Sequence, residues 1–132
     1  KCVGIFDFDW SKIDYRLFDV ALGLVYFTSE WNGAASGSLR MDKFALFLKT
    51  YNEQCTRLDG IEPLTQKEQE NLLSMLAAGN LYVLNWDLMD FYETEDLDDD
   101  EYYTYIEHNI LLMHWINAHF ADISQEIQKV CT

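Results

Sequence analysis

The stretch that decides the fold reads Gly4-Ile5-Phe6-Asp7-Phe8-Asp9-Trp10, followed by Arg16-Leu17-Phe18-Asp19-Val20-Ala21. Both segments are rich in large apolar residues, yet each contains carboxylates. A buried carboxylate is costly unless it is paired, hydrogen-bonded or bound to a metal. Three such groups within thirteen residues, Asp7, Asp9 and Asp19, therefore indicate a specific role.

The first segment predicts a short strand from Val3 to Phe8, because its residues are branched or aromatic and its length is typical. Side chains alternate along a strand, so Asp7 and Asp9 point to the same face. Two carboxylates at a strand end suit Mg²⁺, which prefers oxygen ligands. The spacing alone leaves a second interpretation open, in which both acids are exposed and cap the next turn.

The two segments together resemble the kinase-fold small-molecule phosphotransferases, which include aminoglycoside phosphotransferases, choline kinases and type II homoserine kinases. Their motifs read approximately G-x-I-D-[FW]-[DE]-[WYF] and R-x-x-D-[LIV]-A. The resemblance implies that Asp7 binds the metal and that Asp9 is a possible second metal ligand. It also implies that Asp19, with Arg16 of the same motif, supports the catalytic loop. The implied cofactors are Mg²⁺ and ATP, the phosphoryl donor.

Other parts of the family pattern are missing from these 132 residues. Only six residues precede Asp7, so the H-G-D-x-x-x-x-N loop that carries the catalytic base is absent. The Gly-rich phosphate loop and the nucleotide-binding lysine are absent too. We therefore expect a carboxy-terminal lobe fragment of an enzyme that phosphorylates a hydroxyl of a small molecule. The fragment is expected to be inactive alone, without its amino-terminal lobe. The alternative is a non-enzymatic acidic helical binding module.

The composition is that of one globular domain, with 49% hydrophobic residues and a net charge of −14. This charge repels phosphate backbones, so nucleic acid is not expected as a partner. It attracts cationic ligands, although a solvated acidic surface explains it equally well. The three cysteines have no zinc-site spacing and predict reduced thiols in a cytoplasm. No apolar run is long enough to predict a membrane span.

The periodicity predicts a mainly α fold, with the short strand followed by about four helices, as in the helical carboxy-terminal lobe of a protein-kinase-like (α+β) fold. We treat residues 1–132 as a single partial domain, with a metal-site strand at 1–10 and a helical subdomain at 15–132. The expected helices cover residues 15–31, 40–56, 66–92 and 101–130. Thr65-Gln66-Lys67-Glu68 has the form of a capping box at the start of the third.

Each predicted helix has an apolar face. The first is apolar around nearly its whole circumference, which places Asp19 in or beside the core. Gly79-Asn80 indicates a kink or a close crossing in the third helix. The residues expected to point inward are Leu17, Val20, Ala21, Leu24 and Phe27; Phe44, Phe47, Leu48 and Tyr51; Leu72, Leu73, Leu76, Leu81, Leu84 and Leu88; and Tyr105, Ile106, Leu112, Trp115, Ile116, Phe120, Ile123 and Ile127.

Two further features are weaker signals. The acidic run 93–101 places acids at calcium-loop spacing, but Glu101 occupies the position where that loop needs glycine, so a solvated loop is expected instead. The role of this loop stays open. The histidines share no helix face and predict no metal site. Aromatic residues suit a cationic amine, but packing in the core explains them as well; they are Trp86, Tyr102, Tyr103, Tyr105 and Trp115.

Overall fold

The computed structural model describes residues 14–33, 36–94 and 98–131. The prediction of a mainly α fold is confirmed. The described chain contains α1 (Arg16–Thr28), β1 (Ser29–Glu30), β2 (Ser38–Leu39), α2 (Met41–Cys55), α3 (Gln66–Glu93), α4 (Asp99–Ala118) and α5 (Phe120–Cys131). The predicted strand from Val3 to Phe8 lies outside the described residues. None of the described helices has the length and apolar character needed to cross a membrane.

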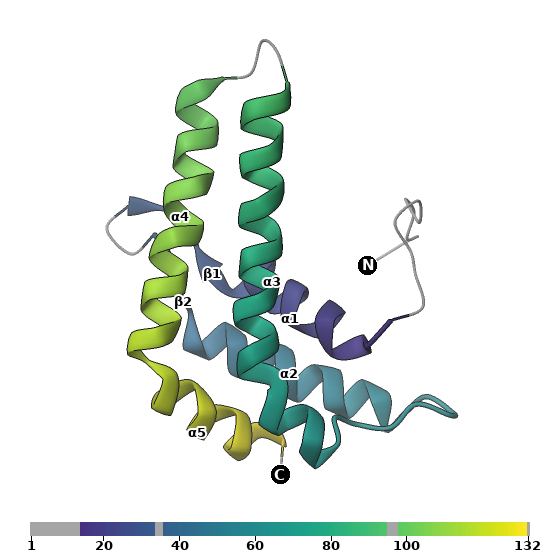
Figure 1. The fold of residues 1–132 in the computed structure, drawn as a ribbon. Coiled ribbons are helices and arrows are strands. Elements are labelled where there is room, and N and C mark those ends of the chain that lie inside the picture. Colours follow the sequence, from purple (N-terminus) through teal and green to yellow (C-terminus); the bar gives the residue numbers. More distant parts are fainter. Residues whose placement is uncertain (1–13, 34–35, 95–97, 132) are drawn as a thin grey trace.

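The helices form a base and a projecting arm (Figure 1). The base consists of α1, α2, α5 and the first half of α3. In the arm, residues 81–93 of α3 and 99–107 of α4 run antiparallel, away from α2 and α5. α3 takes part in both, and it packs chiefly against α1 and α4. Each helix of the base therefore packs against several others, whereas the two helices of the arm pack mainly against each other.

Local sequence sets the start of both long helices. Thr65 and Glu68 form the predicted capping box, with the Thr65 hydroxyl accepting from the Glu68 backbone N–H. Asp98 caps α4 by accepting from the backbone N–H groups of Asp100 and Glu101. The acids in the first turn of α4 also face the positive end of the helix dipole. The acidic run thus ends in a helix start.

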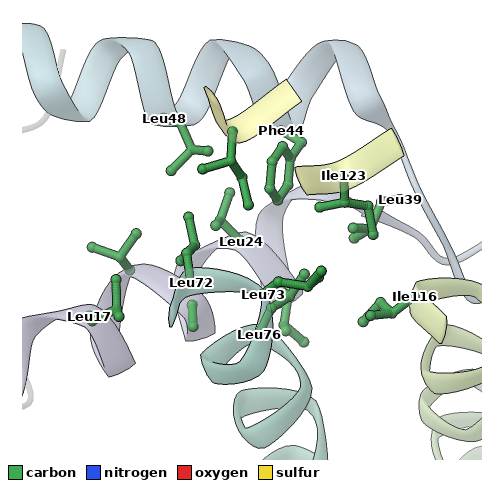
Figure 2. Packing of buried hydrophobic residues seen from close by; sticks show 14 of the residues in the cluster. Leu17, Leu24, Leu39, Phe44, Leu48, Leu72, Leu73, Leu76, Ile116 and Ile123 are labelled. Atoms are coloured by element: carbon green, nitrogen blue, oxygen red, sulfur yellow. The ribbon is translucent and has the colours of Figure 1, made fainter. Parts of the chain in front are cut away.

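The core lies where α1, α2, α3 and α5 meet (Figure 2). Leu24 of α1 and Phe44 of α2 are fully buried there, and Figure 2 shows both near Leu72 of α3. Further buried members are Leu17, Val20, Ala21, Val25, Leu39, Leu48, Leu64, Leu73, Leu76, Val83, Leu112, Ile116, Ile123 and Ile127. Gly79 is buried, and a Cβ placed on it would lie 3.6 Å from the backbone of Ala21. α1 thus crosses α3 at Gly79, where a Cβ would make ordinary van der Waals contact with α1.

The prediction of one continuous fourth helix is wrong, because the chain forms two helices, α4 and α5, with a break between them at His119. This residue has φ −110° and ψ 23°, outside the helical region. Its imidazole Nδ1 lies 2.9 Å from the backbone oxygen of Trp115 and its ring stacks on the Trp115 indole. The break turns α5 so that it packs against α2, which places Ile123 and Ile127 in the core.

Several residues predicted to be buried are exposed. Asp19 is exposed on α1, and Phe27 at the end of that helix is 70% exposed. Leu81, Leu88 and Phe120 are exposed by 54%, 37% and 57%. The periodicity overestimated the buried face because α1 and the second half of α3 are covered on one side only.

Candidate functional site

Of the sequence-predicted site residues, Asp7 and Asp9 lie outside the described residues. The metal role of these two carboxylates therefore stays a prediction. Arg16 and Asp19, from the second half of the motif, both lie on α1. The two residues have different surroundings: Arg16 belongs to a hydrogen-bond network, whereas Asp19 is exposed.

Arg16 joins the start of α1 to the start of α3. Its guanidinium Nε and Nη2 each donate to a Glu68 carboxylate oxygen at 2.7 Å, which is a bidentate ion pair. The same guanidinium donates to the backbone oxygens of Glu62 and Pro63. These contacts raise the pKa of Arg16 above its usual value and lower the pKa of Glu68 to about 2. Arg16 thus fixes the direction in which the chain enters α1.

The prediction that Asp19 lies in or beside the core is wrong. Its neighbours Val20 and Ala21 turn into the core, which leaves Asp19 on the solvent side of α1. Asp19 stands in the first turn of the helix, where a negative charge is favourable. Its support of a catalytic loop, like that of Arg16, stays a prediction, because that loop is expected outside these 132 residues.

An open groove lies beside the Arg16–Glu68 pair. Its larger part has a volume of about 380 Å³, and its walls include Leu17, Lys67 and Asn71. A smaller hollow of about 140 Å³ is lined by Asp14 and Phe18. Tyr15 and Met75 line both parts, so the two are adjacent. The residues that line it begin at Asp14, five positions after Asp9 in the sequence.

A second group of polar side chains, here called the polar seam, lies between α3 and α4. It consists of Asn80 and Asp87 on α3 with His108 and Asn109 on α4. The Asn80 amide donates to the backbone oxygen of Asn109 at 2.8 Å. The Asn109 amide donates to Asp87 Oδ2 at 2.8 Å and to the Tyr105 backbone oxygen at 2.9 Å. The seam links the two helices where the arm leaves the base.

His108 connects this seam to the β1–β2 loop. The backbone N–H of Gly37 donates to His108 Nδ1 at 3.2 Å, and the Ser36 hydroxyl lies 3.2 Å from the same nitrogen. The Trp31 indole stacks on the imidazole with 3.5 Å between ring centroids. Burial lowers the pKa of His108, and with Nδ1 accepting a hydrogen bond the neutral ring carries its proton on Nε2.

Three atoms of the seam are buried and have no hydrogen-bond partner among the described residues: Nε2 of His108 and the amide oxygens of Asn80 and Asn109. Buried polar groups are normally satisfied, often by an ordered water. One N–H donor and two acceptor oxygens are a combination that water can satisfy.

Asp87 is the carboxylate of this seam. Burial, more than any other cause, raises its pKa, and the hydrogen bond from Asn109 opposes that effect. The neighbouring ionisable groups include the Tyr26 hydroxyl and the Asp90 carboxylate. All nine lysines and arginines of the chain lie outside residues 68–128, so no cationic side chain of this segment can pair with Asp87. Such surroundings favour the neutral, protonated form of the carboxyl group.

The five aromatic residues proposed as a ligand pocket do not gather at one place. Trp115 stacks on His119 near the end of α4, whereas Tyr102 and Tyr105 contact each other near its start. Ten residues of helix separate Tyr105 from Trp115, which is about 15 Å. Trp86 contacts Tyr82, which also lies on α3. A single pocket lined by all five residues, which the sequence favours less than core packing, is therefore not formed; Trp115 packs against the core, whereas Tyr103 is exposed.

Sequence reasoning missed the polar seam. Asn80, His108 and Asn109 are all fully buried or nearly so, and each interrupts an apolar stripe. Polar residues within an apolar stripe that packs against another helix predict hydrogen bonds between the two helices. The described residues contain no group of three His, Cys, Asp or Glu that is placed to hold a metal. His114 is exposed, and His119 is half-buried.

Comparison with known proteins identifies no relative, because no protein-family model, no curated protein and no solved structure matches this chain.

Proposed function

We propose that residues 1–132 are the carboxy-terminal lobe portion of an ATP-dependent phosphotransferase that acts on a hydroxyl of a small molecule. The observation that carries this proposal is the ordered pair of motifs, 4–10 and 16–21, with carboxylates at all three positions where the family has them. The mainly helical fold that follows is compatible with such a lobe.

The contacts of Arg16 support the proposal from the structural side. They anchor the start of α1, and this helix follows directly after the segment that carries Asp7 and Asp9. A metal-binding segment needs a rigid attachment if its carboxylates are to stay aligned with a nucleotide. Arg16 and Glu68 would supply that attachment, while the groove next to them would accept part of a substrate.

In this role, Asp7 would bind Mg²⁺ directly, and Asp9 would bind it directly or through water. Their oxygen atoms are the donor type that this ion prefers. The bound ion would neutralise charge on the phosphates during transfer. The catalytic base and the nucleotide lobe would come from sequence other than these 132 residues, and the isolated chain would not turn over ATP.

The charge distribution supports a cationic acceptor, such as an aminoglycoside, a choline-like alcohol or another hydroxylated amine. More than half of the 23 acids lie within residues 68–128, where no lysine or arginine occurs. A field of one sign raises the local concentration of ligands of the other sign. Homoserine, which also carries an amine, fits less well because its carboxylate would be repelled.

The experiment is a phosphoryl-transfer assay on a polypeptide that joins this chain to a segment containing an H-G-D-x-x-x-x-N loop. We expect Asp7→Asn to reduce turnover by roughly 10³-fold or more, since metal-assisted charge stabilisation is lost. Asp42→Asn, at an exposed carboxylate on α2, is the matched control and should leave turnover unchanged. Normal turnover of the Asp7 variant would disprove the metal role.

A second candidate function is a non-enzymatic acidic binding module. It is favoured by exposed apolar side chains on α3, which a purely enzymatic lobe does not require; they are Leu81, Tyr82, Leu88, Met89 and Tyr92. The coding sequence that precedes Lys1 discriminates the two candidates. An in-frame H-G-D-x-x-x-x-N supports the enzyme, and a start codon immediately before Lys1 supports the module.

A further inference from the structure

The β1–β2 hairpin depends on α4 for its position. Its two strands pair over two residues each, and so short a hairpin is marginally stable without further contacts. β2 packs against α4 (Figure 1). The backbone of Gly37 lies directly on this helix, because a Cβ on Gly37 would lie 2.9 Å from the Leu112 backbone nitrogen. Gly37 and His108, which meet at this contact, are both buried.

His108 makes three contacts with the hairpin. Its Nδ1 accepts a hydrogen bond from the Gly37 backbone N–H, and the Ser36 hydroxyl lies near the same nitrogen. The Trp31 indole stacks on the imidazole with an angle of 10° between the ring planes. Nε2 of His108 is buried and has no hydrogen-bond partner among the described residues. The bond to Gly37 requires a neutral ring with no proton on Nδ1.

Protonation of His108 conflicts with this arrangement. A proton on Nδ1 would turn the acceptor into a donor that points at the Gly37 N–H, which is itself a donor. The Ser36 hydroxyl could rotate to accept a hydrogen bond from Nδ1, but the Gly37 amide would have to move away. Both N–H groups of the charged ring would then need acceptors, and a buried charge without them is costly. The charged ring and the observed contact with Gly37 therefore exclude each other.

The neighbouring ionisable groups do not offset this cost. Those on the elements around His108 are Glu30 on β1, Tyr26 on α1, Asp87 on α3, and Glu101, Tyr105 and Glu107 on α4. The Glu30 carboxylate accepts from backbone N–H groups of its own loop, and Asp87 accepts from Asn109. Burial is the cause of the lowered pKa of His108, and none of these carboxylates is a cause.

We infer that His108 is a pH switch that fixes the loop end of the hairpin, here defined as residues 30–33 and 36–38, on α4. With a neutral ring the loop end is bound, and with a charged ring it is released. Release would expose Trp31 and the surface of α4 beneath Gly37, while Leu39 stays in the core and keeps the hairpin attached. The inference goes beyond the proposed phosphotransferase function and does not depend on it.

Proton linkage gives the sign and the size of the effect. In the released state His108 has the ordinary histidine pKa of about 6.5, whereas burial lowers the pKa in the bound state. The bound state is therefore favoured above about pH 6.5, and the equilibrium constant for release rises as the pH falls below it. Between pH 7.5 and pH 5.5 this constant rises by at most about tenfold, the limit set by a ring that never protonates while bound.

The experiment is native-state hydrogen exchange of the full 132-residue chain, followed by NMR at about pH 7.5 and about pH 5.5 and corrected for intrinsic exchange rates. We expect the protection of the Gly37 amide to fall roughly threefold to tenfold at the lower pH. At both pH values it should be less protected than the amide of Leu48, which lies in the core. Circular dichroism should show the helices unchanged.

Two variants test whether His108 is the titrating group. His108→Gln keeps an acceptor for the Gly37 N–H but does not titrate, so the protection of Gly37 should change less than twofold between the two pH values. His114→Gln is the matched control, because His114 is exposed on the same helix. It should keep the pH dependence of the wild-type chain.

A measurement on the wild-type chain covers the case in which His108→Gln does not fold. NMR of the imidazole nitrogens should show His108 protonated on Nε2 at pH 7.5, with a pKa below that of His114. A proton on Nδ1, or a His108 pKa at or above that of His114, would overturn the inference. So would protection of Gly37 that is equal at both pH values or equal to that of Leu48, or a pH dependence that survives His108→Gln.

Discussion

Replacing Glu68 with glutamine removes a carboxylate that holds two helix starts together. In the wild-type chain its two oxygens accept two of the guanidinium hydrogen bonds of Arg16. One of them also accepts from the backbone N–H of Thr65 at 2.7 Å and from the Thr65 hydroxyl at 2.8 Å. Glutamine retains one acceptor oxygen for the cap but has no charge, so it cannot form the bidentate ion pair.

The pKa shift of Glu68 sets an upper limit for the stability that Glu68→Gln removes. The pKa of Glu68 falls from 4.5 to about 2 in the folded chain, and the hydrogen bond from Arg16 is the largest cause. The unscreened equivalent of this shift is about 3 kcal/mol. Solvent screens the pair, since 33% of the Arg16 side chain and 23% of the Glu68 side chain are exposed. We therefore expect Glu68→Gln to lower the free energy of unfolding by about 1–2 kcal/mol at pH 7.

The sign of the pH dependence follows from the lowered pKa. The stabilisation is complete above the unfolded value of 4.5 and disappears as the pH falls through 4.5 toward 2. Urea unfolding followed by circular dichroism at pH 7 and at about pH 3 measures it. The difference between wild type and Glu68→Gln should shrink by at least half at the lower pH.

A matched control is Glu70→Gln, because Glu70 is exposed one half-turn further along α3 and its recorded contact is with Gln66. This change should cost less than about 0.5 kcal/mol at either pH. A difference between wild type and Glu68→Gln that stays constant from pH 7 to pH 3 would refute the reasoning, since the ion pair would then contribute nothing.

Two further perturbations test the contacts between the β1–β2 loop and α4. Gly37→Ala should destabilise the fold by about 2 kcal/mol or more in urea unfolding, because Gly37 has φ +76° and a Cβ there would lie 2.3 Å from the Leu111 Cβ. Gly60→Ala is the control: Gly60 has φ +79° but open space around it, so this change should cost only about 1 kcal/mol. Burial lowers the pKa of His108, so the stability it contributes is present above the unfolded pKa of about 6.5 and declines below it. Thermal unfolding between pH 7.5 and 5.5 should therefore show a decline that His108→Gln reduces and that the exposed-site control His114→Gln does not.

Local patterns in the sequence predicted the capping box and the helices 40–56 and 66–92, whereas the expected helix 15–31 is wrong at its end, because α1 stops at Thr28 and Ser29–Glu30 form β1. Thr65 and Glu68 form their cap from residues three positions apart, and such short-range chemistry needs no knowledge of the fold. The helix bounds 66–92 and 40–56 differ from the observed Gln66–Glu93 and Met41–Cys55 by one residue at most ends. Burial of Leu24, Phe44 and Leu72 was predicted for the same reason, because each lies on a regular stripe.

Features that depend on neighbours far away in the sequence were not predictable in this way. The break at His119 has neither proline nor glycine as a signal, and it is set by where α5 meets α2. Asp19 has an apolar sequence context, yet only one side of α1 is covered. Leu81 and Leu88 continue the stripe of leucines, but Asn80 and Asp87 take the positions that face α4.

The polar seam also determines the alignment of the arm. Two leucine-rich helices can slide past each other by one turn with little change in apolar contact, whereas buried polar groups match only in one alignment. A shift of α4 by a turn would separate Asn109 from Asp87 and leave Asn80 without its acceptor. The arm consequently has one register, and the same few hydrogen bonds keep its outer surface at a constant orientation relative to the base.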